Sequence, residues 1–311
     1  MNISLILLSH NRSSDLERLF SSIVSQDINT NRYEIIVSDD GSCDSTPAVV
    51  KKYQLQNKGI KFLQKPKSNV SLSRNAGVKA ATNGLILFLA DDYILDCPDT
   101  LSKIISIFEK YQPDILKIKI ASPESCNYLN AANHAYNSFN SDILLAYAKL
   151  DKIPCNEKEE VCRINHFNDS TGCIYKKPIF DQVGLYGNYD KGEDTEFATR
   201  VCGHHLNIYY CPSIKLVHNH SYHWYSFLQY HFQRGKGVFA LEHSPKYKNL
   251  FSSRCKTMSY YFKQLYITPS KIIKSNKNAI KYLPIFFLIL LALNLGVFYY
   301  MLKSRPRAPL Q

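Results

Sequence analysis

The chain has 311 residues, of which 45% are hydrophobic, and this is enough for one large domain or two smaller ones with a packed core. The formal net charge of +12 comes from one end, because twelve Lys and Arg and no Asp or Glu follow Glu242. The first 242 residues carry no net charge, which argues against a nucleic-acid-binding domain. A basic tail beside an apolar segment instead indicates binding to anionic lipid.

Strand and helix patterns alternate over the first 120 residues. Apolar runs predict strands at 3–9, 34–38, 60–63, 85–89 and 115–120. Amphipathic stretches between them predict helices at 15–26, from about residue 47, at 71–81 and at 100–111. Strands separated by helices of this length are typical of a parallel, doubly wound α/β sheet, and the apolar strands fit burial on both faces.

The alternation weakens after about Ala121. Residues 122–166 are rich in Asn, Tyr and Lys, and we expect loops and short helices there, around a second pocket. A pattern returns with strands at 173–175, 206–211 and 214–218, a helical turn at 178–183 and a helix at 193–202. The aromatic and basic stretch at 222–267 is typical of interfacial amphipathic helices or, equally, of ordinary packing helices.

Residues 283–302 form an uncharged apolar run that is long enough to cross a hydrocarbon core of about 30 Å. We expect a transmembrane helix, with a buried core helix as the alternative. Basic residues flank both sides, so its orientation is not fixed. The N-terminus lacks the basic region and cleavage site of a signal peptide, and we therefore expect the large N-terminal part to be cytosolic, anchored to the membrane by this C-terminal helix.

The nine cysteines are irregularly spaced and include no CxxC pair. A zinc site or a disulfide framework is therefore not expected. Reduced thiols are the expected state in a cytosolic domain.

Three acidic pairs stand far apart in the chain. Asp39-Asp40 and Asp91-Asp92 each follow a predicted strand, and Glu193-Asp194 opens a predicted helix. Carboxylates at the carboxyl ends of parallel strands point into the crevice where open α/β sheets bind ligands. Together the pairs predict a site for a nucleotide, a divalent cation and a general base. The plainer interpretations are a turn, a loop cap and a helix terminus stabilised by its dipole, respectively.

Five short motifs follow one another along the chain: SHNR at 9–12, VSDDGSCDST at 37–46, SRNAG at 73–77, LILFLADDY at 85–93 and GEDTEF at 192–197. They resemble the inverting family-2 glycosyltransferases of GT-A fold over roughly residues 1–220. This resemblance implies an enzyme that moves one sugar from a nucleotide-diphosphate sugar, expected to be UDP-linked, to a hydroxyl of a saccharide or lipid-linked acceptor. The apolar and basic C-terminal tail in turn suggests a membrane-held acceptor, and with it a role in cell-surface polysaccharide or glycolipid assembly.

The resemblance implies a set of donor-binding residues: Asn11, Arg12, Asp39, Asp40, Arg74 and Asp91. Asp39 is expected near the nucleobase, and because a carboxylate accepts from a pyrimidine N–H, it favours uracil. Asp40 is expected near the phosphates and ribose, and Asp91 near the donor sugar or ribose. Arg74 is expected to touch a phosphate, although a plain surface arginine of the helix fits as well.

A divalent metal, Mn²⁺ or Mg²⁺, is implied by the acid pair that follows the fourth strand. Asp92 is expected to contact it, whereas Ala90 stands where the family often has a first carboxylate, which lowers the expected affinity. His218 follows the last predicted strand and is expected as a second ligand, with a structural strand-end histidine left open; His220 is two residues further on.

Asp194 is the candidate general base, because inversion needs a carboxylate that takes the acceptor's proton from the face opposite the leaving diphosphate. Glu193 is expected to orient the acceptor or the backbone. Two alternatives stay open: a catalytically weak nucleotide-sugar-binding protein of the same fold, motivated by Ala90, and a nucleotidyltransferase. The absence of a Gly-rich, basic triphosphate loop near the first strand argues against the latter.

The resulting division of the chain has five parts. We expect a nucleotide-sugar-binding half at 1–120 and an acceptor-binding, catalytic half of the same domain at 121–221. A basic aromatic membrane-proximal region at 222–282, a transmembrane helix at 283–302 and a basic tail at 303–311 follow. The expected partners are the donor, the acceptor and the membrane, and no nucleic acid.

Overall fold

The structure is a computed structural model that describes residues 1–57, 59–136, 161–164, 167, 172–189, 192–242 and 277–303. The chain divides into two compact units. The first comprises Met1–Glu124, Asn140–Tyr189 and Glu193–His220, and the second Ser125–Phe139, Asp190–Gly192 and Ser221–Gln311. The predictions for 137–160, 243–276 and 304–311 lie outside the described residues.

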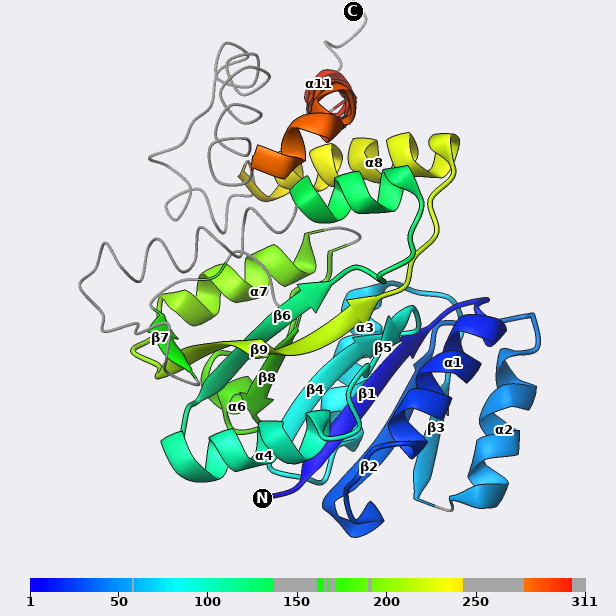
Figure 1. Cartoon of the computed structure of the whole chain (residues 1–311), viewed down its shortest axis with the longest axis vertical. Coiled ribbons are helices and arrows are strands. Elements are labelled where there is room, and N and C mark those ends of the chain that lie inside the picture. The colour runs from blue at the N-terminus through cyan, green and yellow to red at the C-terminus, as the bar shows by residue number, and fades with distance from the viewer. Residues whose placement is uncertain are drawn as a thin grey trace, which may run out of the picture. The chain divides into compact units, whose positions relative to one another are not determined.

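In the described part of the chain, the first unit is built on one mixed sheet of nine strands (Figure 1). Its first half is parallel, in the order β3 (Ile60–Gln64), β2 (Tyr33–Asp39), β1 (Ile3–Ser9), β4 (Leu85–Ala90). β8 (Cys173–Lys176) pairs antiparallel with β4 and leads to β6 (Ile115–Ala121), β9 (Ile208–His218) and β5 (Tyr93–Ile94), and β7 (Cys162–Ile164) pairs with β9.

Helices cover both faces of this sheet because successive side chains of each strand point to opposite sides. Ile3, Leu5 and Leu7 of β1 pack on one face and Ile6 on the other. The first face carries α1 (Ser13–Val24), α2 (Thr46–Gln56) and α4 (Thr100–Tyr111). The second carries α3 (Val70–Ala80), α6 (Ile179–Gln182) and α7 (Glu193–Cys202); a short 3₁₀ helix, η1, spans Thr30–Arg32. The predicted α/β architecture is confirmed.

Two details differ from the expectations. The strands predicted at 206–211 and 214–218 form the single strand β9, whose pairing with β6 shifts register between Ile118 and Lys119. Pro212, which has no backbone N–H to donate to the ladder, lies in the part of β9 skipped by this shift. Cys162 is disulfide-bonded, so the expectation of wholly reduced thiols is wrong at this position.

The ends of the parallel strands meet along one edge of the sheet. Ser9 pairs with Asp39, Asp39 with Gln64, and Leu8 with Ala90, so the segments after these strands emerge side by side. Gly41, in the turn after β2, has a φ of +78°, and a Cβ there would lie 2.7 Å from the backbone nitrogen of Lys67. Only glycine adopts this close, left-handed turn without strain.

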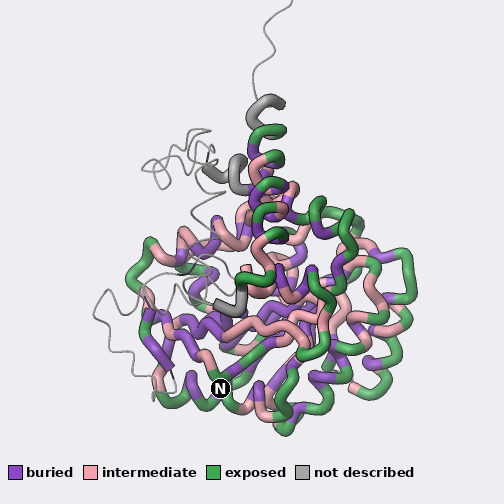
Figure 2. Tube along the Cα trace, turned by 45° about the horizontal axis from the view of Figure 1, so that its top comes forward, coloured by how far each residue is buried: buried purple, intermediate pink, exposed green. Residues whose placement is uncertain are grey.

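The second unit is helical. Residues 128–136, α8 (Trp224–Glu242), η3 (Lys277–Tyr282) and α11 (Leu283–Lys303) share a cluster that includes Phe227, Phe286 and Ile289. α8 and α11 cross closely, because a Cβ on Gly235 would lie 1.9 Å from the carbonyl oxygen of Leu293. Figure 2 shows buried and exposed residues alternating along α11. Among the described residues, Ile280–Tyr299 is the one segment long and apolar enough to cross a membrane.

Candidate active site

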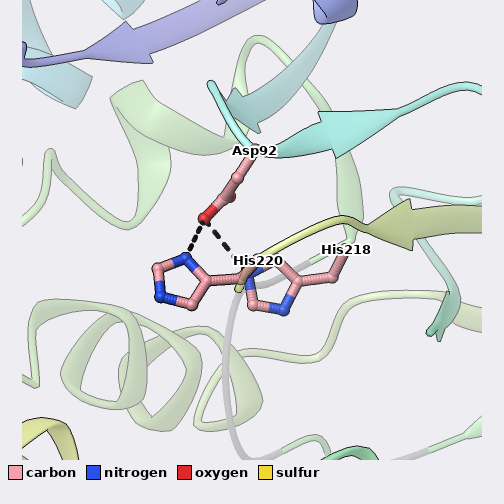
Figure 3. Close-up of side chains that lie close together, drawn as sticks. All are labelled: Asp92, His218 and His220. Carbon is pink, nitrogen blue, oxygen red and sulfur yellow. Dashed lines mark hydrogen bonds and ion pairs between the residues drawn. The ribbon is translucent and has the colours of Figure 1, made fainter. Parts of the chain in front are cut away.

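Asp92 is the centre of a charged cluster just after β4 (Figure 3). Its Oδ2 lies 2.9 Å from Nδ1 of His220, 3.4 Å from Nε2 of His218 and 3.0 Å from Nη1 of Arg12. The ligand atoms of Asp92 and the two histidines all lie within 4.8 Å of one another. The Asp92 side chain is buried, and its Oδ1 has no hydrogen-bond partner within the described part of the chain. Such an oxygen is costly unless a ligand binds it.

Two strand ends bring these residues together. Tyr93 of β5 pairs with His218 of β9, and the backbone N–H of Asn219 donates to the carbonyl of Asp92 at 2.8 Å. These backbone contacts hold the end of β9 against the residues that follow β4. Arg12 reaches the cluster from the N-cap position of α1, after the end of β1.

The two aspartates of this pair differ in their electrostatics. Burial works to raise the pKa of Asp92, but hydrogen bonds with His218 and His220 and the charge of Arg12 outweigh it and hold this pKa well below its usual range. Burial raises the pKa of Asp91 to about 7, against the opposing charge of Arg12. Asp92 is therefore the fully charged member of the pair.

Asp39 belongs to the turn that follows β2 and is fully buried. Its Oδ2 accepts from the backbone N–H of Ser42 at 3.0 Å, and its Oδ1 accepts from the Ser42 hydroxyl. The same hydroxyl accepts from the backbone N–H of Asn11 at 2.9 Å, and the side chain of Asn11 accepts from the backbone N–H of Cys43 at 2.8 Å. Asp39 and Asn11 thus tie the loop after β1 to the loop after β2.

Asp40, the next residue, faces the loop after β3. Its Oδ1 pairs with the ammonium group of Lys65 and accepts from the backbone N–H and hydroxyl of Ser68 at 2.9 and 2.8 Å. Burial works to raise the pKa of Asp40, but the hydrogen bonds from Lys65 and Ser68 outweigh it, so the pKa is lowered. A cation therefore already accompanies this carboxylate.

Arg74 lies on α3 between two aromatic rings. Its guanidinium carbon is 5.2 Å from the ring centre of Phe88 and 5.1 Å from that of Tyr186, distances typical of cation–π contacts. One of its nitrogens, Nη2, lies 3.7 Å from Oε1 of Glu193. Burial works to lower the pKa of Arg74, but Tyr186 and the charges of Glu193 and Asp194 outweigh it, and the pKa is raised.

Asp194 stands in the first turn of α7, where its Oδ1 accepts from the backbone N–H of Thr195 at 2.8 Å. Glu196 of the same motif is buried and pairs with Arg200, whose guanidinium donates to the carbonyls of Val183 and Leu185 at 2.6 and 2.7 Å. Glu196 therefore holds α7 to the preceding loop, while Asp194 is the less enclosed acid.

The structure gathers the predicted site residues into local groups. Arg12, Asp91, Asp92 and His218 form one, Asn11 and Asp39 a second, Asp40 a third, and Arg74 with the Glu193-Asp194 pair a fourth. His220 was not predicted as a ligand, although its spacing from His218 after a strand was the available signal. No sequence signal identified Lys65 and Ser68 as partners of Asp40.

Residues 4–184 match the family model described as glycosyl transferase family 2. This match covers more than half of the chain, so the chain belongs to that family. The poly(ribitol-phosphate) beta-N-acetylglucosaminyltransferase TarS of Staphylococcus aureus is 30% identical over 122 residues, which is 39% of this chain and 21% of TarS. The GalNAc(5)-diNAcBac-PP-undecaprenol beta-1,3-glucosyltransferase of Campylobacter jejuni is 37% identical over 92 residues, 29% of each protein. The chain thus matches less than a third of the length of either relative.

Solved structures with the same fold match almost the whole length of this chain. The mannosyltransferase PcManGT of Pyrobaculum calidifontis, in complex with GDP-Man and Mn²⁺, has a TM-score of 0.66 at 12% identity over 98% of this chain and 88% of its own. Residues 1–349 of S. aureus TarS with UDP-GlcNAc have a TM-score of 0.55 at 15% identity over 99% and 93%. At these identities the likeness concerns the fold, and the predicted GT-A fold class is confirmed.

The residues around Asp92 fit a divalent transition metal. One carboxylate and two imidazoles suit Mn²⁺ better than Mg²⁺, which prefers oxygen ligands. Oδ1 of Asp92, which has no partner among the residues that the structure describes, offers such an ion a buried oxygen. Arg12 contacts the other oxygen of the same carboxylate.

Proposed function

We propose that this chain is a membrane-associated, metal-dependent inverting glycosyltransferase that moves one sugar from a UDP-linked donor to a hydroxyl of a saccharide or lipid-linked acceptor. The observation that carries the proposal is the Asp92–His218–His220 cluster in a chain of family 2, with a buried Asp92 oxygen that has no partner in the described ranges. The names of the relatives support a role in cell-surface polysaccharide or glycolipid assembly, because they include a poly(ribitol-phosphate) and an undecaprenol-linked saccharide. The UDP-GlcNAc in TarS supports a UDP-linked donor.

The reaction assigned to the site has one chemical step. The oxygen of the acceptor hydroxyl attacks the anomeric carbon, its proton passes to Asp194, and the bond from that carbon to the diphosphate oxygen breaks. The nucleotide diphosphate leaves from the opposite face, so the configuration inverts. Glu193 orients the acceptor. Asp92, His218 and His220 would hold the divalent ion, which when bound would supply positive charge to the leaving diphosphate.

The donor is assigned to the edge where the parallel strands end. Asp39 and Asn11 face the nucleobase side, Asp40 the ribose and phosphates, and Asp91 the donor sugar or ribose. Asp39 already accepts from Ser42 at both oxygens, so we assign its contact with the base to the remaining lone pairs. Arg12 belongs to the same nucleotide wall.

The five-part division at 120, 221, 282 and 302 is proposed for the whole chain, with the catalytic domain in the cytosol and 283–302 in the membrane. One face of α11 supports the membrane assignment, because Phe287, Leu291 and Leu295 are 43%, 47% and 51% exposed at helical spacing. Exposed apolar side chains in such a row fit a lipid environment.

The proposal is tested with a panel of nucleotide sugars, with and without Mn²⁺, scored first by thermal stabilisation and then by sugar transfer. We expect a UDP-sugar to stabilise the chain most, in the presence of Mn²⁺, and to be the donor that is consumed. Stabilisation without any transfer would favour the weak binding protein. Release of pyrophosphate from a nucleoside triphosphate would instead identify a nucleotidyltransferase.

Replacing Asp194 by Asn tests the base directly. We expect Asp194→Asn to lower turnover by roughly 1,000-fold, since general base catalysis contributes about that much, while donor-induced stabilisation is kept. The matched control is Asp181→Asn, which removes an exposed carboxylate from α6. Unchanged turnover in Asp194→Asn would remove this residue from the mechanism.

A further inference from the structure

Helix α3 carries a row of polar side chains that hold the loop preceding the Glu193-Asp194 pair. The side-chain amide of Asn75 donates to the carbonyl of Tyr186 at 2.9 Å and accepts from its backbone N–H at 3.0 Å. Nearer the start of the helix, the hydroxyl of Ser71 donates to the carbonyl of Tyr189 at 3.0 Å. Asn69, the N-cap of α3, donates from its side-chain amide to the side-chain oxygen of Asn188 at 2.6 Å. Residues 186–189 are thus fixed to α3 at three successive points.

Arg74 completes this contact from the same helix. Its side chain is 12% exposed and stands between the rings of Phe88 and Tyr186, which restrict where its guanidinium can point. The group faces Glu193 at 3.7 Å, and its Nε has no hydrogen-bond partner within the described ranges. A guanidinium enclosed by two rings keeps its charge and its plane in one place, whereas a lysine on its flexible stem would not.

We infer that Arg74 is a positioning residue: it fixes Glu193, the first residue of α7, to α3, while Asn75 holds the loop before α7. Glu193 and Asp194 are thereby kept in the orientation that proton transfer from the acceptor needs. This rests on the proposed function and differs from the phosphate contact that the motif resemblance implied for Arg74. Helix α3 then serves the acceptor side of the reaction.

The test uses the full chain and three variants. Arg74→Gln removes the charge, Arg74→Lys keeps the charge but not the planar group, and Lys79→Gln removes an exposed charge from the same helix as a control. UDP affinity is measured by calorimetry with Mn²⁺ and without acceptor, and kcat is measured with both substrates saturating. We expect Arg74→Gln to lower kcat roughly 100-fold, because a small displacement of a catalytic group has about that effect, and to leave UDP affinity unchanged.

The conservative variant distinguishes positioning by the planar guanidinium from a simple need for positive charge. Arg74→Lys should recover only part of the kcat that is lost in Arg74→Gln, because it keeps the charge but not the planar group. Weakened UDP binding with kcat unchanged would overturn the inference and return Arg74 to the donor site.

Two further measurements cover the case in which Arg74→Gln folds poorly or the wild type transfers no sugar. Hydrogen exchange of backbone amides in 186–189 and 192–196 should be faster in Arg74→Lys than in the wild type and in Lys79→Gln, and equal exchange in all three would overturn the inference. In a double-mutant cycle, the effects of Arg74→Lys and Glu193→Gln on the free energy of unfolding should be non-additive. Additive losses of stability would also overturn the inference. Wild-type turnover reports on the proposed function, whereas these differences report on Arg74.

Discussion

Asp92 and Glu34 are two largely buried carboxylates of the same parallel group of strands, and they differ in how completely they are bonded. Glu34, near the start of β2, accepts from the hydroxyl of Ser4 at 2.6 Å, from the backbone N–H of Thr82 at 2.6 Å and from the ammonium group of Lys61 at 2.8 Å. Asp92, beyond the end of β4, has partners on Oδ2, whereas its Oδ1 has none among the described residues.

This difference separates a stabilising carboxylate from one that is open to a ligand. A buried carboxylate with hydrogen-bond partners on both oxygens contributes to the stability of the fold. One that has two imidazoles at one oxygen and an unused second oxygen has the donor set of a metal site. Both carboxylates have a lowered pKa, so the pKa alone does not distinguish them. The unused oxygen of Asp92 distinguishes the two.

Among the changes to these two carboxylates and their partners, Asp92→Asn has the largest expected effect. In this variant the proposed ion loses Asp92, the one carboxylate of the Asp92–His218–His220 cluster. We expect turnover to fall by roughly 100-fold or more, because a metal contributes several kcal/mol of transition-state stabilisation. Thermal stabilisation by Mn²⁺ alone should disappear in this variant and persist in Glu34→Gln. Equal stabilisation of Asp92→Asn and the wild type by Mn²⁺ would show that the ion binds elsewhere.

Glu34→Gln should act on stability instead of chemistry. Burial works to raise the pKa of Glu34, but hydrogen bonds from Lys61, Ser4 and Thr82 outweigh it and lower the pKa to about 2. A shift of this size corresponds to about 3 kcal/mol of folding free energy, which the partial exposure of Lys61 reduces to roughly 2 kcal/mol. We expect that loss in the variant at pH 7, measured by urea unfolding, with turnover per folded molecule unchanged.

The sign of the pH dependence follows from the lowered pKa. The contribution of Glu34 is fully present above its unfolded pKa of about 4.5 and is lost as the pH falls toward 2. The stability difference between wild type and Glu34→Gln should therefore be constant above about pH 5 and shrink below it. The control, Glu124→Gln, removes an exposed carboxylate and should show no such difference. A gap that stays constant down to pH 3 would contradict this account.

The sequence predicted the positions of the elements well because the relevant forces are local. β1, α4 and α7 begin and end at the predicted residues, since apolar alternation and helical spacing are read within a single segment. The acid pairs were placed at strand ends for the same reason. The register of the parallel strands then brings Ser9, Asp39 and Gln64 to one edge, as expected for this topology.

The pairing of side chains was less predictable because it depends on neighbours far apart in the chain. The direction of the Arg74 side chain is set by Phe88 on β4 and Tyr186 before α7, which the local sequence does not indicate. His220 reaches Asp92 only because β9 ends beside β5. Two separate strands were predicted at 206–211 and 214–218, whereas the ladder between β6 and β9 continues past Pro212 with a shifted register. Apart from the two-residue spacing of His218 and His220, these contacts leave no pattern in the sequence.

The smallest expected effect concerns the basic partner of Asp92. Arg12 contacts the oxygen of Asp92 that also faces the two histidines, so in the absence of nucleotide its charge competes with a divalent ion. The Arg12 side chain is 36% exposed, and pairs this open to solvent contribute up to about 1 kcal/mol. We therefore expect Arg12→Gln to bind Mn²⁺ alone roughly 2- to 5-fold more tightly, measured by calorimetry.

Two controls decide whether that change reflects competition at Asp92. Arg18→Gln removes a more exposed charge from the same helix, α1, and should leave Mn²⁺ affinity unchanged. Lys61→Gln removes the basic partner of Glu34 and should lower stability without altering Mn²⁺ affinity. Weaker Mn²⁺ binding in Arg12→Gln would mean that the guanidinium organises the ligands instead of competing for them. In that case Arg12 and Lys61 would play the same structural part, and the contrast between the two carboxylates would rest on the unused oxygen of Asp92 alone.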